Sequence, residues 1–190
     1  MRIVIVLISS LFIFQSCSSQ EIANKQEQID QAVLAAVESD RAECTVYGYT
    51  SDGQFVKLRE GSNQMICISD DPTKKGFSVA CYHKKLDEFM ARGRALKAEG
   101  KSRQEIFDIR EEEVKSGKLS LPANSTLSVY SGKTDEDTGE PIDPKLRYVF
   151  YIPFATSEST GLPTSPPVSG APWIMDPGTH RAHIMINPVQ

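Results

Sequence analysis

An uncharged run of twelve residues, Ile3 to Phe14, constrains this chain more than any other feature and lies directly behind Arg2. As a helix it would span about 18 Å, well short of the ~30 Å hydrocarbon core of a bilayer. A short apolar segment behind a positive charge is typical of an export signal, not of a permanent membrane span. We therefore expect residues 1–16 to be a cleaved signal peptide that takes no part in the folded domain.

The residues Phe14-Gln15-Ser16-Cys17 lie where cleavage would occur. This segment resembles the lipobox of bacterial lipoproteins, in which a small residue precedes an obligatory cysteine. The resemblance implies that the Cys17 thiol receives a diacylglyceryl group and that the peptide before it is removed. Two acyl chains are enough for stable attachment, because each buried CH₂ contributes about 0.8 kcal/mol. The alternative is an ordinary secretory peptide beside an incidental cysteine.

The chain after Cys17 begins with a polar stretch, so we expect a lipidated tether over residues 17–28 and one domain over residues 29–190. Ser18 stands where lipoproteins of the inner membrane commonly have aspartate. The resemblance therefore implies the cell envelope, with the outer membrane favoured over the inner. The expected partner is the membrane, and the net charge of −4 makes nonspecific binding to nucleic acid unfavourable.

The periodicity of apolar residues changes along the rest of the chain, which predicts helices and strands in separate runs. Helices are expected at about 25–39, 84–98 and 102–116, and the capping box Ser102-Arg103-Gln104-Glu105 opens the last of them before Gly117 ends it. Strands are expected at 45–49, 55–58, 65–68, 126–130, 147–152, 173–175 and 183–186. Early hairpins, central helices and late strands predict an α+β fold with a mainly antiparallel sheet and about three helices.

Three cysteines, Cys44, Cys67 and Cys81, remain in the exported part. Disulfides persist in oxidising compartments, and closing the loop between Cys67 and Cys81 could contribute about 3 kcal/mol. We favour this pair and expect Cys44 to be a buried free thiol, although spacing alone does not fix the connectivity.

Histidines supply most of the candidates for chemistry, and no nucleophile elbow, Walker loop or dinucleotide-binding fingerprint is present in the sequence. The candidate catalytic residues are His183, His83 and Asp176. His180 could join His183 in a metal site, but the run from Ala182 to Ile186 favours a strand, where positions three apart face opposite ways. Structural histidines are the favoured interpretation, and neither a metal nor a cofactor is expected.

An acidic stretch from Asp135 to Asp143 faintly resembles a calcium loop through Asp135, Asp137 and Asp143. The sixth position has Glu140 in place of glycine, and the twelfth has Leu146 in place of the bidentate glutamate. We interpret the stretch as a solvated connection between strands.

The C-terminal run Gly170-Ala171-Pro172-Trp173-Ile174-Met175-Asp176-Pro177-Gly178-Thr179, followed by Ala182-His183-Ile184-Met185-Ile186, resembles the ending of an uncharacterised group of exported bacterial proteins. The run from Val56 to Asn63 before Cys67 is similar to an earlier motif of the same group. The resemblance implies no activity. In structural terms, the Pro177-Gly178 pair can turn the chain into a final strand.

Two hypotheses for function follow. The first is an envelope lipoprotein whose domain is a noncatalytic binding or structural module. The second is a hydrolase-like envelope enzyme with a polar site around His183, joined by His83 or Asp176.

Overall fold

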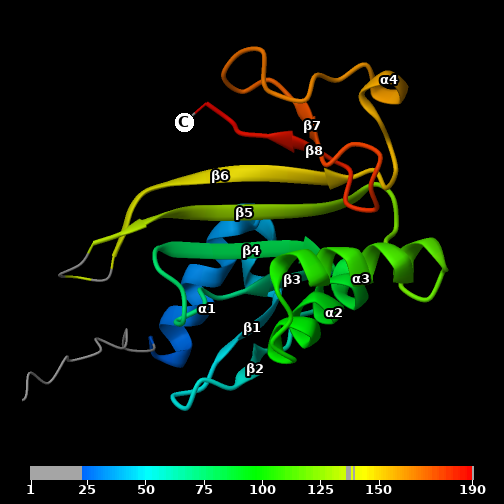
Figure 1. Ribbon diagram of the computed structural model, residues 1–190. Helices are drawn as coiled ribbons and strands as arrows, with labels where there is room; N and C mark the ends of the chain where they lie inside the picture. The colour runs from blue at the N-terminus through cyan, green and yellow to red at the C-terminus, as the bar shows by residue number, and fades with distance from the viewer. Residues whose placement is uncertain (1–22, 136–137, 139, 190) are drawn as a thin grey trace, which may run out of the picture.

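Eight strands form one sheet in the computed structural model, which describes residues 23–135, 138 and 140–189 (Figure 1). Their order across the sheet is β2-β1-β3-β4-β5-β6-β8-β7, and every neighbouring pair is antiparallel except β1 and β3. The strands are β1 (Thr45–Tyr49), β2 (Phe55–Arg59), β3 (Met65–Ile68), β4 (Phe77–His83), β5 (Ser125–Thr134), β6 (Pro141–Tyr151), β7 (Trp173–Met175) and β8 (His183–Ile186). The prediction of an α+β fold with a mainly antiparallel sheet is confirmed.

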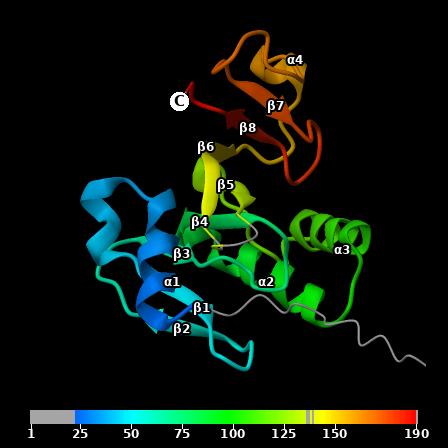
Figure 2. The same cartoon turned by 90° about the vertical axis from the view of Figure 1, so that its left-hand side faces the viewer.

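Helices cover both faces of this sheet, with α1 on one face and α2 and α3 on the other (Figure 2). The α-helices of the described residues are α1 (Lys25–Ala32), α2 (Asp87–Ala98), α3 (Arg103–Lys115) and the single turn α4 (Ser157–Thr160). Short 3-10 helices lie at η1 (Val33–Ala35), η2 (Glu38–Glu43) and η3 (Lys84–Leu86). The capping box of Ser102 and Glu105 forms as expected, and Gly117 takes the left-handed conformation just after α3 (φ 75°).

The sheet therefore has two apolar cores, one on each face. Under α1, Val79 and Cys81 of β4 pack with Val46 and the helix residue Ala32. On the other face, Tyr82 of β4 packs under Phe89 of α2 and joins residues of β6 and β8. Because successive side chains of a strand point to opposite faces, the central strand β4 contributes to both cores.

The disulfide Cys67–Cys81 joins directly opposed residues of β3 and β4, with a Cα–Cα distance of 4.1 Å. Cys44 is free and fully buried. Both cysteine predictions are confirmed.

Some predicted boundaries were wrong. The first helix ends at Ala32 and continues as 3-10 turns, and Val37, expected on its apolar face, is 65% exposed. This helix already begins at Lys25, so the last part of the expected tether belongs to the domain, and Gln28 is buried. Strand β4 was not expected at all, although Phe77, Val79 and Cys81 alternate after Gly76 as a half-buried strand requires.

Among the residues that the structure describes, no helix is both long and apolar enough to cross a membrane. The predicted signal peptide and Cys17 lie outside the described residues.

Candidate functional site

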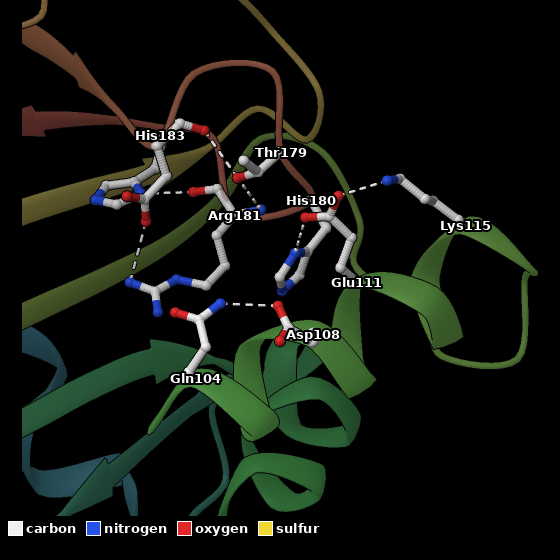
Figure 3. Close-up of polar contacts among 9 residues, drawn as sticks. Gln104, Asp108, Glu111, Lys115, Thr179, His180, Arg181 and His183 are labelled. Carbon is white, nitrogen blue, oxygen red and sulfur yellow. Dashed lines mark hydrogen bonds and ion pairs between the residues drawn. The ribbon is translucent and has the colours of Figure 1, made fainter. Parts of the chain in front are cut away.

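Polar side chains gather where the turn between β7 and β8 meets α3. The turn is made possible by positive φ angles at Asp176 (50°) and Gly178 (79°). Backbone bonds hold it in place: Gly178 N donates to Ala155 O (2.7 Å), and Phe154 N donates to Thr179 O (2.8 Å). The next residues of the turn, His180 and Arg181, are thereby directed onto α3 (Figure 3).

His180 is completely buried between aromatic rings of the two long helices. Its ring centre lies 4.8 Å from that of Phe107 and 5.7 Å from that of Phe89. Its Nδ1 lies 3.0 Å from Glu111 Oε2, while its Nε2 is buried without a hydrogen-bond partner among the described residues (Figure 3). Burial lowers the pKa of His180, and the hydrogen bond with Glu111 opposes this shift in part. The neutral imidazole therefore donates from Nδ1 and keeps a bare lone pair on Nε2.

Arg110 is a second buried polar group beside His180, with only 9% of its surface exposed. Its guanidinium carbon lies 4.1 Å from the centre of the Phe89 ring, and Nη1 donates to Phe89 O (3.3 Å). A Cβ added at Gly93 would lie 3.0 Å from Arg110 Nη1, so glycine leaves room for this side chain between the helices. Its Nε has no partner among the described residues. Burial, with Arg181 nearby, lowers the pKa of Arg110 to about 10.

Arg181 and Tyr151 approach the same place from the turn and from β6. Arg181 lies over Phe107, 5.7 Å from the ring centre, and pairs with Asp176 at 3.2 Å. The Tyr151 ring lies 6.0 Å from that of Phe89, and burial raises the pKa of its hydroxyl. The positive charges of Arg181 and Arg110 partly offset this rise in the pKa of Tyr151, and the negative charge of Asp176 adds to it.

His183 begins β8 beside Tyr151, with the two ring centres 5.7 Å apart. Its Nδ1 lies 2.6 Å from Arg181 O (Figure 3). A carbonyl oxygen can only accept, so Nδ1 carries the proton and Nε2 is the free acceptor. Burial lowers the pKa of His183, which keeps the ring neutral near pH 7.

Together these residues form what we call the Arg110 cluster, whose members are Arg110, Tyr151, Asp176, His180, Arg181 and His183. It can accept or donate hydrogen bonds and it can stabilise negative charge. Two of its atoms, Arg110 Nε and His180 Nε2, are buried without partners among the described residues.

The structure brings only part of the predicted catalytic set together. Asp176 lies close enough to influence the pKa of His183, but its carboxylate pairs with Arg181. His83 ends β4, where its Nδ1 accepts a hydrogen bond from Lys85 N (3.1 Å). Since β5 and β6 lie between β4 and β8, His83 is about 14 Å from His183 across the sheet.

No group of three or more His, Cys, Asp or Glu side chains in the described part of the chain could hold a metal ion. Of the faint calcium loop, Asp137 lies outside the described residues. Asp135 accepts hydrogen bonds from Thr138, and Asp143 pairs with Lys145 (2.7 Å). These contacts are those of a connection between β5 and β6.

Comparisons with protein families, with characterised proteins and with solved structures found no match for this chain. The resemblance to bacterial lipoproteins and to an exported group therefore stays a prediction.

Sequence reasoning missed Arg110, Glu111, Tyr151 and Arg181. Arg110 sits in a helix full of charged residues, and nothing in the local pattern distinguishes a buried arginine from an exposed one. One usable indication was Gly93 within a helical run, because an interior glycine costs stability unless close packing requires it.

Proposed function

We propose that the protein is an exported lipoprotein, held to a membrane of the bacterial cell envelope by lipid on Cys17, and that its domain is a binding module. The observation that carries the proposal is the position of Cys17 between an apolar export segment and the start of the fold. The first helix begins at Lys25, only eight residues after Cys17. A link of this length holds the domain within about 28 Å of the anchored cysteine, even when it is fully extended.

The site favours a binding module over an enzyme. His183 is fixed by the Arg181 carbonyl, and no serine, threonine or cysteine of the described residues is hydrogen-bonded to it. Nucleophilic catalysis needs a nucleophile and a base within hydrogen-bond reach. The hydrolytic alternative gains no support from His83, which lies across the sheet.

The placement of the Arg110 cluster also supports a displayed binding site. Helix α1, where the tether enters, packs on β1, β2 and β4. The cluster lies toward the other end of the sheet, where Tyr151 ends β6 and His183 begins β8, and β8 is five strand spacings or about 24 Å from β1. With the anchor at the α1 end, the cluster would therefore lie on a part of the domain remote from α1 (Figure 1).

The test of the anchor is the substitution Cys17→Ser. Removal of the only thiol beside the export segment should abolish incorporation of labelled fatty acid and move the protein from the membrane to the soluble fraction. The measurement is metabolic labelling followed by fractionation.

The matched control is Ser19→Ala, which changes a polar residue of the same segment and leaves the cysteine in place. It should be labelled and membrane-bound like the wild type. A Cys17→Ser protein that is still labelled, or still membrane-bound after normal processing, would contradict the proposal.

A further inference from the structure

Arg110 is a buried cation without a counterion among the described residues. Three nearby carboxylates are already paired with other groups. Glu113 receives Arg92 through bonds of 2.8–3.1 Å, Glu111 binds His180 and Lys115, and Asp176 binds Arg181. A buried charge is costly unless it is paired, and the ring of Phe89 with one carbonyl replaces only part of what water would supply.

We propose that Arg110 is the buried half of a binding site for one small oxyanion, a carboxylate or a phosphate, which Arg181 and Tyr151 complete. The guanidinium fork matches the geometry of either group, because two parallel N–H donors can meet two oxygens. The proposal names the ligand class of the binding module proposed above and so rests on that function, but it is independent of the lipid anchor.

The donors of the proposed site contact one connected group of aromatic rings. Arg110 and Tyr151 both contact Phe89, and Arg181 contacts Phe107, while His180 touches both rings. Arg110 and Tyr151 therefore share the Phe89 ring, and His180 connects this ring to Phe107 under Arg181. Low polarity around the site strengthens each charged hydrogen bond to a bound anion.

Access is provided by Arg181. The Arg181 side chain is 25% exposed and that of its partner Asp176 is 34% exposed. Ion pairs at the surface contribute only about 0–1 kcal/mol, and water reaches this half-buried pair, so an incoming oxyanion can compete with Asp176 for Arg181. The Arg181 side chain would then bring the anion toward Arg110.

His180 links anion binding to protons. Its Nδ1 is occupied by Glu111, and its unpaired Nε2 can become a donor only by taking up a proton. Arg110 and Arg181 disfavour that proton, Glu111 favours it, and Lys115 weakens the effect of Glu111 by pairing with the same carboxylate. An anion in the cluster cancels the repulsion from the arginines and favours the imidazolium, so acetate, which stays ionised near neutral pH, should bind more tightly as the pH falls.

The experiment uses the full-length protein in detergent micelles. Sodium phosphate and sodium acetate are titrated separately at pH 7, with sodium chloride holding the ionic strength constant, and thermal unfolding is followed. A saturable rise in Tm of about 3–5 °C is expected at ten times the Kd. A rise with phosphate alone, acetate alone or both supports the proposal and identifies the oxyanion.

The variant Arg110→Met keeps an unbranched side chain over Phe89 and removes the charge. It should lose the rise in Tm, and without added anion it should unfold at a higher temperature than the wild type, because an unpaired buried cation has gone. The matched control is Arg103→Met, which removes an exposed arginine from the same helix and should keep the response.

If Arg110→Met does not fold, the wild type still decides the question through NMR. The Arg110 Nε–H resonance should shift along a saturable curve with the Kd found from unfolding. No saturable response to either anion in the wild type, or an equal rise in Arg110→Met, overturns the proposal. If neither anion binds but Cys17→Ser is released into the soluble fraction, the oxyanion site is refuted and the proposal of a lipid anchor is still supported.

Discussion

At the scale of single residues, this domain buries several groups that ordinarily face water. Arg110, His180 and His183 are all nearly inaccessible to solvent, so the charge state of each affects the stability of the fold. The two histidines are neutral because burial penalises the imidazolium. The stability of the fold should therefore depend on pH in a range where most carboxylates stay ionised and do not titrate.

The predicted effect is a loss of stability in mild acid. Burial makes the pKa values of His180 and His183 lower in the folded chain than the usual 6.5 or so, which the unfolded chain keeps. As the pH falls below about 6.5, the unfolded chain takes up protons that the folded chain refuses, so stability is full above this pH and declines below it. Urea unfolding between pH 7.5 and 5.5 should show a loss of up to about 1.4 kcal/mol per pH unit for each histidine.

The substitution His180→Gln should flatten this pH dependence, although it also lowers stability at every pH by removing a buried ring. The matched control is His83→Gln, at a half-buried histidine of another strand. An equal flattening in both variants would show that burial of His180 is not the cause.

At the scale of elements, α1 is fixed to the sheet by one polar side chain inside an otherwise apolar contact. Gln28 Nε2 donates to Tyr49 O (2.9 Å), and Gln28 Oε1 accepts from Tyr49 N (2.8 Å) and from Ser69 Oγ (3.1 Å). A Cβ at Gly48 would collide with Gln28 Oε1, so the glycine lets the helix approach the strand. This arrangement sets where the helix sits at the end of β1.

Replacing Gln28 with leucine should destabilise the domain by about 2–4 kcal/mol, because both part-buried backbone groups of Tyr49 lose the partner that Gln28 supplies, and the Ser69 hydroxyl keeps only its longer bond to Asp70 O (3.4 Å). The measurement is the free energy of unfolding in urea. Gln26→Leu, two residues earlier on the exposed side of the same helix, should change it by less than about 0.5 kcal/mol. Similar losses in the two variants would contradict the assigned role of Gln28.

At the scale of the whole molecule, the helices on both faces pack on the same central strands of the sheet. The disulfide Cys67–Cys81 joins two of these strands and lies in the core under α1. It constrains the chain between residues that would otherwise separate on unfolding. The disulfide should therefore raise the free energy of unfolding of the whole domain, which we expect to unfold cooperatively.

Replacing both Cys67 and Cys81 with alanine should lower the stability by about 3 kcal/mol, or a Tm by about 6–12 °C. Thermal unfolding with and without a reducing agent is the measurement. The reducing agent should lower the Tm of the wild type toward that of the double variant and leave the double variant unchanged. To reduce the buried disulfide, the wild type is first unfolded and refolded in the reducing agent. If its Tm is then the same as without the reducing agent, the disulfide does not contribute to stability.

Local patterns were enough for much of the fold. The capping box at Ser102 and the strands at Trp173–Met175 and His183–Ile186 formed as expected, because turns, caps and alternation depend on neighbouring residues. The pair Cys67–Cys81 was favoured for its oxidising compartment and loop length, whereas its place on opposed positions of β3 and β4 came only from the structure. In the candidate site, the sequence pointed to His183, Asp176 and His180 but not to the residues that contact them.

By itself, then, the sequence determined the class of the fold, most of its elements and the predicted export segment, since each of these depends on composition and spacing along the chain. Only the tertiary structure decided that β4 lies in the middle of the sheet, that His83 is remote from His183 and that Arg110 is buried beside His180. The physical reason is that burial and pairing are set by contacts between distant segments. A helix rich in charged residues gives no local sign that one of its arginines faces inward without a carboxylate partner among the described residues.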